Sequence, residues 1–258
     1  MLQDWQVVIL RAKHQAQGLA SALLEHKAEL TLLPLIDIVP LAILPSALHA
    51  WQNALKNADF LLVTSANAAF CAPEELLNFI SEKTVVMTMG QATSQALLEK
   101  HPTLQIHYTA PPGATSESIL NEPFLQADRV KNKKVALLAG KDGRTVFADT
   151  LANRGAQIEW MIVYEQQKPD IDLAETLLSL QLHPKVCFIA TSSRVLENLV
   201  TMAPPTLVEW LLSVHLVVVS HRIYQHAKDK GFKQIVLADG AQTHAILQAL
   251  KAYLSTTV

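Results

Sequence analysis

FLLVTS, at residues 60–65, is the stretch of the 258-residue sequence that decides the fold. Its four consecutive apolar residues predict a strand buried on both faces, and the Thr64-Ser65 pair that follows predicts the start of a helix. The same order of apolar run, small or hydroxyl residues and helical stretch recurs along the chain. The predicted strands are residues 7–10, 60–63, 84–87, 134–138, 186–190, 216–219 and 234–238. This alternation indicates an α/β fold with parallel sheets flanked by helices.

Two long extended segments interrupt the alternation. Residues 29–39 contain Pro34 and end before Pro40, and residues 156–168 end before Pro169. About three strand–helix units lie between these segments, and about three follow the second. Residues 63–67 (VTSAN) and 190–194 (ATSSR) also share a pattern, which suggests two related halves. We therefore expect two α/β lobes joined by two linker strands.

Composition and charge exclude several classes of protein. Half of the residues are apolar and only 17% are charged, which excludes intrinsic disorder. The 21 Lys and Arg residues are offset by 23 Asp and Glu, so no nucleic-acid partner is expected. No run approaches the roughly 20 apolar residues of a membrane span, and the N-terminus does not read as a signal peptide. We expect a cytoplasmic protein in which Cys71 and Cys187 are buried rather than disulfide-bonded.

The common catalytic and cofactor motifs are missing from the sequence. The ten histidines show neither HxxxH nor HExxH spacing, and the two cysteines form no CxxC pair. There is no GxSxG, GxGxxG or GxxxxGK[ST], and residues 140–145 (GKDGRT) have the wrong order for a phosphate-binding loop. The sequence therefore predicts neither a metal site nor a nucleotide cofactor.

Hydroxyl and glycine residues follow most of the predicted strands, where helices begin. Helix capping is the ordinary explanation for any one of them, since a capping Ser or Thr stabilises a helix by about 1 kcal/mol. Their number allows a second interpretation, because several helix N-termini along the edge of each sheet, facing a cleft, would bind a molecule with many anionic groups. The positions are Thr64-Ser65, Gly90 with Thr93, Thr115-Ser116, Gly140 with Gly143, Thr191-Ser192-Ser193, and Ser220.

Three further side chains are candidates for the same site. Arg11 ends the first strand and Arg144 lies beside Gly143; each is either an anion contact or a member of an ordinary ion pair. Tyr164 lies in the second extended segment. It is either a packing residue or a proton donor, since a phenol with a pKa near 10 stays protonated at neutral pH.

A series of weak motifs follows a fixed order along nearly the whole chain. The motifs are residues 8–11 (VILR), 58–68 (ADFLLVTSANA), 89–93 (MGQAT), 115–120 (TSESIL), 137–144 (LLAGKDGR), 151–156 (LANRGA), Val163-Tyr164, 189–193 (IATSS), 218–220 (VVS) and 231–232 (GF). In this order they resemble the uroporphyrinogen-III synthase family. Ala139 stands where that family often has arginine, which makes Arg144 the better candidate for a guanidinium contact.

The resemblance implies a fold and a domain organisation. The first lobe would be discontinuous, formed by residues 1–37 and 169–258, and the second would comprise residues 38–160. A two-stranded linker, about residues 30–40 and 157–168, would join them. The resemblance implies no cofactor and no metal.

The resemblance also implies a reaction. Hydroxymethylbilane, a linear tetrapyrrole with carboxylates on every ring, would lose water and close to uroporphyrinogen III with ring D inverted. Tyr164 would protonate the departing hydroxyl, and the lobes would close over the substrate. The carboxylate contacts would be Arg11, Ser65, Thr93, Ser116, Gly143, Arg144, Ser192, Ser193 and Ser220.

Partners follow from the same resemblance. We expect a monomer that makes at most transient contact with hydroxymethylbilane synthase and binds neither nucleic acid nor membrane. The alternative is a non-catalytic, two-lobe cytoplasmic protein that binds an anionic ligand, because such a protein has the same fold. A flavodoxin-like or response-regulator protein would need a flavin or an acidic pocket at the strand ends, where hydroxyl residues dominate instead.

Overall fold

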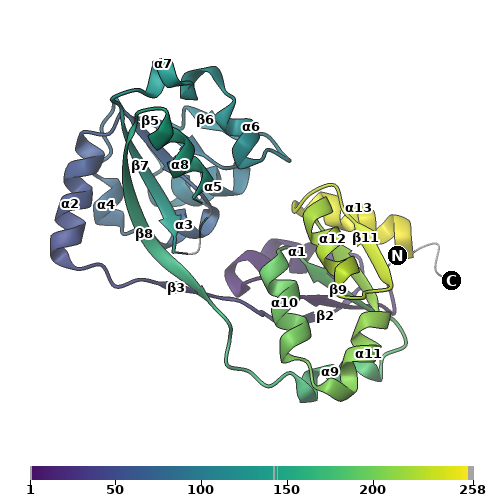
Figure 1. Ribbon diagram of the computed structural model, residues 1–258. Coiled ribbons are helices and arrows are strands. Elements are labelled where there is room, and N and C mark those ends of the chain that lie inside the picture. The colour runs from purple at the N-terminus through teal and green to yellow at the C-terminus, as the bar shows by residue number, and fades with distance from the viewer. Residues whose placement is uncertain (1, 142, 144, 255–258) are drawn as a thin grey trace. The chain divides into compact units, whose positions relative to one another are not determined.

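The computed structural model describes residues 2–141, 143 and 145–254, and the chain forms two compact units. Unit 1 consists of Met1–Asp37 and Gln167–Val258, and unit 2 consists of Ile38–Gln166. The chain therefore passes from unit 1 to unit 2 and back again, as Figure 1 shows by its colours. Each unit has one sheet.

Unit 1 is built on a five-stranded sheet with the order β11-β10-β9-β1-β2, in which every neighbouring pair is parallel. The strands are β1 (Gln6–Ile9), β2 (Glu29–Leu32), β9 (Val186–Ala190), β10 (His215–Val218) and β11 (Gln234–Leu237). The helices are α1 (Lys13–Glu25), α9 (Ala174–Gln181), α10 (Ser193–Met202), α11 (Pro205–Ser213), α12 (His221–Asp229) and α13 (Thr243–Leu254).

Unit 2 is built on a six-stranded sheet with the order β3-β8-β7-β4-β5-β6, parallel from β8 to β6. The strands are β3 (Asp37–Pro40), β4 (Phe60–Val63), β5 (Val85–Thr88), β6 (Tyr108–Thr109), β7 (Lys134–Gly140) and β8 (Gln157–Gln167). The helices are α2 (Pro45–Lys56), α3 (Ala66–Cys71), α4 (Glu74–Leu77), α5 (Gln91–Lys100), α6 (Ser116–Leu120), α7 (Ala127–Val130) and α8 (Val146–Asn153), with a short 3₁₀ helix, η1 (Pro123–Leu125).

Strand β4 confirms the prediction made from FLLVTS. Its side chains alternate between two cores: Phe60 and Leu62 belong to the core on one face of the sheet, and Leu61 and Val63 to the core on the other. This is the period of two that a strand imposes, so a continuous apolar run fills both faces. The fold class predicted from the sequence, α/β with parallel sheets flanked by helices, is confirmed.

Two helices end just before a glycine. Gly155 and Gly231 come after α8 and α12 with φ angles of 88° and 94°, a backbone conformation that favours glycine. A glycine just after the last helical residues is a usual sequence signal for a helix end, and both residues fit it. By contrast, the sequence prediction does not include α2, α9 or α11; α2 and α11 begin at Pro45 and Pro205, where proline fits the first helical turn.

The two extended segments are strands of the sheets. Residues 29–39 divide between β2 in unit 1 and β3 in unit 2. Residues 157–167 form β8, which pairs with β7 from Gln157 to Tyr164 and buries Met161 and Val163 completely. Unit 2 ends at Gln166, within the stretch 157–168 that the sequence predicts as a linker strand, and the apolar side chains of β8 belong to a core of unit 2.

The cysteines differ from each other in exposure. Both are free thiols; Cys187 is fully buried in β9, whereas Cys71 is half-buried. Burial raises the pKa of the Cys187 thiol to about 12, so it packs as a small apolar residue. None of the helices in the described part of the chain is long and apolar enough to span a membrane.

Candidate active site

The predicted site residues of unit 2 follow neighbouring strands of its sheet. Parallel strands end at one edge, and at this carboxyl edge the strand order is β8, β7, β4, β5 and β6. Tyr164 lies in β8, and the others follow the next strands in turn: Gly143 after β7, Ser65 after β4, Thr93 after β5 and Ser116 after β6. The topology therefore gathers residues that are up to 99 positions apart in the sequence.

Tyr164 and Ser65 are in direct contact. The Tyr164 hydroxyl oxygen lies 3.1 Å from Ser65 Oγ, and either can donate the hydrogen bond. Tyr164 is only 6% exposed, so its ring packs in a core of unit 2 while its hydroxyl reaches the strand ends. Tyr164 is therefore a packing residue, as one of the two interpretations drawn from the sequence predicts, and its role as a proton donor stays a prediction.

Ser65 is at the same time the N-cap of α3. Its Oγ accepts a hydrogen bond from the Ala68 N–H at 3.1 Å. Ser192 and Ser220 make the same contact in unit 1, where they accept from Val195 at 3.2 Å and from Ile223 at 3.3 Å. All three serines therefore cap helices, as the ordinary explanation for these residues predicts. It leaves other N–H groups of each first helical turn to be satisfied.

The remaining predicted residues of unit 2 differ from one another in how far they are exposed to a ligand. The Thr93 side chain is buried, at 4% exposure, which leaves it little surface for a ligand. Ser116 is half-buried at the start of the five-residue α6, where Thr115 and not Ser116 caps the helix. Gly143 is exposed and donates its N–H to the Gly140 carbonyl at 3.0 Å. The predicted Arg144 lies outside the described residues.

Unit 1 presents its candidates on three adjacent strands. In the order β10, β9 and β1, the carboxyl ends are followed by Ser220, by Ser192 with Ser193, and by Arg11. The hydroxyl residues and the guanidinium are therefore gathered at one edge of one sheet. Residues 63–67 and 190–194 occupy equivalent positions, each joining a strand end to a serine-capped helix.

Arg11 is held by backbone carbonyls. Its Nη1 donates to the Gln15 carbonyl at 3.4 Å and its Nη2 to the Ala241 carbonyl at 3.2 Å. Its Nε is buried and has no hydrogen-bond partner among the described residues. Burial lowers the pKa of this guanidinium, yet arginine stays a cation in proteins. Within the described part of the chain no carboxylate pairs with Arg11, which leaves its charge suited to an anionic ligand.

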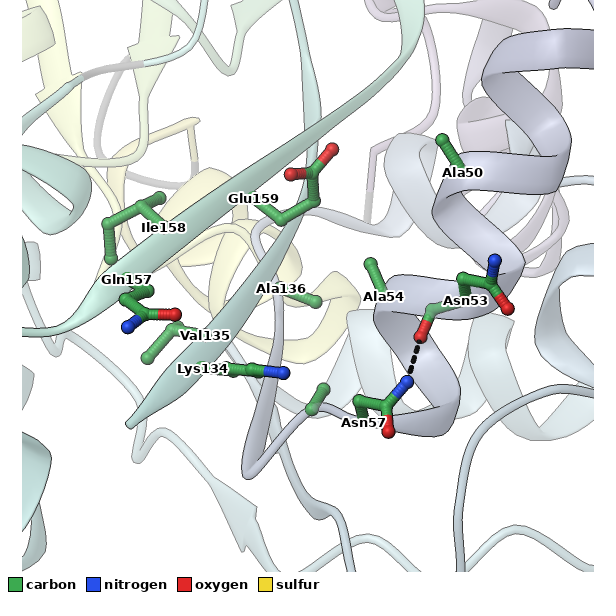
Figure 2. A pocket seen from close by; sticks show the side chains of 11 residues that line it. Ala50, Asn53, Ala54, Asn57, Lys134, Val135, Ala136, Gln157, Ile158 and Glu159 are labelled. Carbon is green, nitrogen blue, oxygen red and sulfur yellow. Dashed lines mark hydrogen bonds between the residues drawn. The ribbon is translucent and has the colours of Figure 1, made fainter. Parts of the chain in front are cut away.

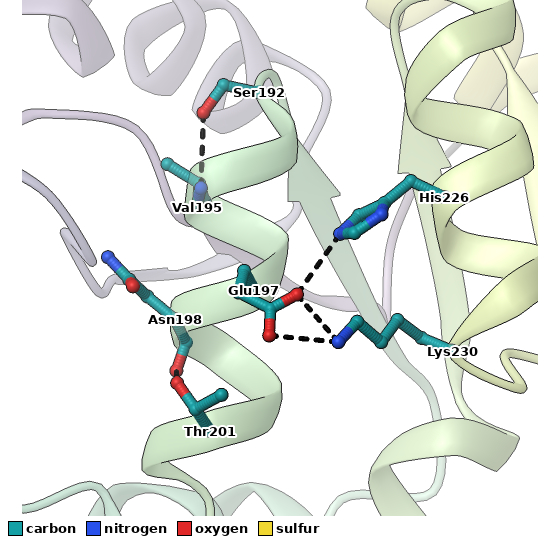
Figure 3. A network of polar contacts seen from close by, with 7 residues as sticks. All are labelled: Ser192, Val195, Glu197, Asn198, Thr201, His226 and Lys230. Atoms are coloured by element: carbon teal, nitrogen blue, oxygen red, sulfur yellow. Dashed lines mark hydrogen bonds and ion pairs between the residues drawn. The ribbon is translucent and has the colours of Figure 1, made fainter. Parts of the chain in front are cut away.

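A polar cluster fixes α10 beside α12, the helices that Ser192 and Ser220 cap (Figure 3). Glu197 of α10 forms an ion pair with Lys230 at 2.7 Å, and one of its oxygens lies 3.3 Å from His226 Nε2. The hydrogen bond from Lys230 lowers the pKa of Glu197, so the carboxylate is charged at neutral pH. The cluster therefore links the middle of α10 to the C-terminal end of α12.

A cavity of unit 2 lies away from the candidate residues. It has a volume of about 370 Å³ and is bounded by α2 on one side and by the beginnings of β7 and β8 on the other (Figure 2). Lys134 and Gln157, the first residues of these strands, line it. It is therefore at the amino edge of the sheet, opposite Ser65 and Tyr164. Within residues 2–141, 143 and 145–254, no three His, Cys, Asp or Glu side chains are placed to hold a metal ion.

Comparison with known proteins decides the family. The family model described as uroporphyrinogen-III synthase HemD matches residues 3–248. The chain belongs to the uroporphyrinogen-III synthase family. The resemblance that the ordered motifs carry is thus confirmed, and family membership favours an enzyme, a lyase, over the alternative of a non-catalytic binding protein.

Individual members of the uroporphyrinogen-III synthase family are similar over much of the chain. The uroporphyrinogen-III synthase of Escherichia coli K12 is 28% identical over 230 residues, 84% of this chain and 88% of that protein. The enzyme of Proteus mirabilis is 30% identical over 165 residues, 62% of this chain and 79% of that protein.

Solved structures of the family share the fold. A mutant uroporphyrinogen III synthase from Thermus thermophilus matches with a TM-score of 0.61 at 17% identity, covering 97% of this chain and 99% of that chain. The uroporphyrinogen-III synthetase of Helicobacter pylori 26695 matches with a TM-score of 0.58, also at 17% identity, over the same shares of the two chains. At this level of identity the likeness shows the fold alone.

Proposed function

We propose that this protein converts hydroxymethylbilane into uroporphyrinogen III, with loss of water, closure of the macrocycle and inversion of ring D. The observation that carries the proposal is the match of the family model to residues 3–248. The carboxyl edges of the two sheets support it. That of unit 1 presents two serine-capped helix starts and Arg11, and that of unit 2 presents the helix start capped by Ser65; such groups suit a substrate with a carboxylate on every ring.

The chemistry demands positioning more than strong acid or base groups. Loss of the substrate hydroxyl gives an azafulvene cation that the pyrrole nitrogen stabilises, and unaided closure gives the type I isomer. The protein must hold the chain so that the substituted carbon of ring D reacts first, through a spiro intermediate. Positioning of reacting groups can lower a barrier by about 7–11 kcal/mol in favourable cases.

Tyr164 is the proposed proton donor. Its O–H bond breaks as the departing hydroxyl takes the proton and leaves as water. The ring carbon that forms the closing bond later releases a proton, which restores the phenol. The substrate therefore loses one water and nothing else. Ser65 lies 3.1 Å from the phenol oxygen, where its own O–H can donate to the phenolate that forms in between.

The proposed carboxylate contacts are divided between the units. In unit 1 they are Arg11, Ser192, Ser193 and Ser220, all at one sheet edge. In unit 2 they are Ser65, Ser116 and Gly143, together with Arg144 outside the described residues. Thr93 remains a prediction from the sequence, but the proposal does not depend on it because its side chain is buried.

An isomer assay tests the function. The purified protein is incubated with hydroxymethylbilane, the products are oxidised, and the porphyrin isomers are separated by chromatography. The expected product is predominantly the type III isomer. If the type I isomer that forms spontaneously were the sole product, the proposed function would be wrong.

Exchanging Ser192 for aspartate separates capping from binding. Aspartate is as good an N-cap as serine, so Ser192→Asp should leave the melting temperature of the protein unchanged. Two unit charges 4 Å apart near a protein surface repel by about 4 kcal/mol, so an aspartate beside a substrate carboxylate should raise KM about ten-fold or more. Steady-state kinetics and thermal unfolding measure the two effects.

The matched variant is Ser192→Ala, which removes the cap without adding charge. It should cost about 1 kcal/mol of unfolding free energy and raise KM less than the aspartate does. An unchanged KM in Ser192→Asp would show that Ser192 only caps α10.

We further infer that the protein acts in the cytoplasm as a monomer and receives its substrate during transient contact with hydroxymethylbilane synthase. The instability of the substrate supports a short transfer, because free hydroxymethylbilane closes spontaneously to the wrong isomer. Analytical ultracentrifugation of the protein alone and with that synthase tests both points. A stable dimer of the protein alone would contradict the first.

A further inference from the structure

The ends of β7 and β8 meet in an irregular pairing. The two strands run in register up to Ala139 and Ile162, but the next pair is Gly140 and Tyr164, so β8 contains one extra residue at this point. Such a bulge changes the direction in which the following side chain points, and bulges are frequent beside active sites. Here the residue that follows the bulge is Tyr164.

Backbone and side-chain contacts fix the bulge in place. The Lys141 N–H donates to the Tyr164 carbonyl at 2.8 Å. Lys141 Nζ also forms an ion pair with Glu165 at 2.9 Å, so a second contact joins the end of β7 to β8 next to Tyr164. The backbone of Tyr164 is therefore fixed, and only the ring torsions decide where the hydroxyl lies.

The absence of a side chain at Gly140 makes room for the ring of Tyr164. A Cβ atom at position 140 would lie 2.5 Å from Tyr164 Cζ and 2.8 and 2.9 Å from its two Cε atoms. These are the ring atoms nearest the hydroxyl, and all three distances are shorter than any ordinary carbon contact. Because Tyr164 is 6% exposed and packed in a core, the ring cannot turn away without losing its present contacts.

The phenol oxygen reaches Ser65 from this position, and Ser65 is itself fixed. Its Oγ accepts from the Ala68 N–H, and the Thr64 hydroxyl beside it donates to the Leu138 carbonyl of β7 at 3.1 Å. A small displacement of the ring would therefore break the contact between Tyr164 and Ser65, because Ser65 is held at the start of α3 and cannot follow the ring.

We propose that Gly140 is a positioning residue for Tyr164: its missing side chain lets the phenol lie across the end of β7 with its hydroxyl on Ser65. The proposal deepens the proposed function and depends on it for the catalytic consequence. Gly140 itself need not touch the substrate. An alanine at this position would keep every polar group of the site and move only the ring.

Gly140→Ala tests the proposal by structure and by rate. The protein has four tyrosines, so 3-fluorotyrosine labelling gives four fluorine NMR signals, and Tyr164→Phe identifies the one from position 164. In Gly140→Ala this signal should move while the other three stay. The kcat for type III formation should fall about 10²-fold, as displacements of about 1 Å can cause, with KM within about three-fold.

Gly18→Ala is the matched control. Gly18 lies in α1, and a Cβ atom there would meet nothing within 4 Å, so this variant should change neither the fluorine spectrum nor the kinetics. If Gly140→Ala left the Tyr164 signal or the type III rate unchanged, the proposal would be overturned.

A double variant covers the case in which Gly140→Ala does not fold. Tyr164→Ala removes the ring, so adding Gly140→Ala to it should cause no further loss of stability or of rate. A double variant that folds where Gly140→Ala alone does not supports the proposal. A double variant that is unfolded, or that is slower than Tyr164→Ala alone, would overturn the proposal. The fluorine spectrum needs no turnover, so it tests the placement of the ring even if the isomer assay refutes the proposed function.

Discussion

Tyr164→Phe is expected to lower the rate of type III formation by about 10²–10⁴-fold, the usual contribution of a general acid. The ring stays, so packing against Gly140 and the core of unit 2 is kept. Only the hydroxyl and its contact with Ser65 at 3.1 Å are lost. The measurement is the initial rate of each isomer, with the spontaneous type I reaction followed in parallel without protein.

Tyr108→Phe is the control for this variant. Tyr108 also belongs to unit 2, and its hydroxyl donates to Glu122 at 3.0 Å, so the variant removes a comparable hydrogen bond. Burial, together with Glu122, raises the pKa of Tyr108, so this phenol keeps its proton at neutral pH. Full activity and selectivity in Tyr164→Phe would remove Tyr164 from the mechanism and leave the positioning of the chain as the source of selectivity.

Much of the fold could be predicted from the sequence because strands buried on both faces are continuous apolar runs. The predicted strands 60–63 and 186–190 coincide with β4 and β9. The helices α2, α9 and α11 are not predicted, because none of them directly follows one of the apolar runs that predict strands. Residues 29–39 read as one strand, yet they divide between two sheets, since pairing partners far along the chain decide where a strand belongs.

The candidate site could be predicted only in part. The sequence shows which residues follow strands, and parallel sheets place these residues at one edge. It could not show that Ser65 touches Tyr164, because that contact depends on the strand order β8-β7-β4 and on the bulge between Ala139 and Gly140. It also could not show that Thr93 is buried, or that Gly140 is needed for the ring of Tyr164. For this pairing the sequence shows only a glycine at the end of one predicted strand, Gly140, and a tyrosine in the extended segment that follows, Tyr164.

Leu177→Ala should cost about 2–5 kcal/mol of unfolding free energy, as buried leucine truncations do. Leu177 lies in α9 with no exposed surface, and Figure 1 shows α9 beside α11, which buries Leu207 and Leu211. Because the chain forms two compact units with separate cores, the loss should be confined to unit 1. Hydrogen exchange at increasing urea concentration, read by mass spectrometry on peptides of β9 and β4, measures the stability of each unit.

The neighbouring residue gives the control for this comparison. Leu178 lies in the same helix but is 53% exposed, so Leu178→Ala should change the unfolding free energy by no more than about 0.5 kcal/mol. Equal losses in the two variants would mean that α9 does not pack as the structure has it. Equal losses of protection in β9 and β4 after Leu177→Ala would mean that the two units unfold together, and the chain would then behave as one cooperative body despite its two cores.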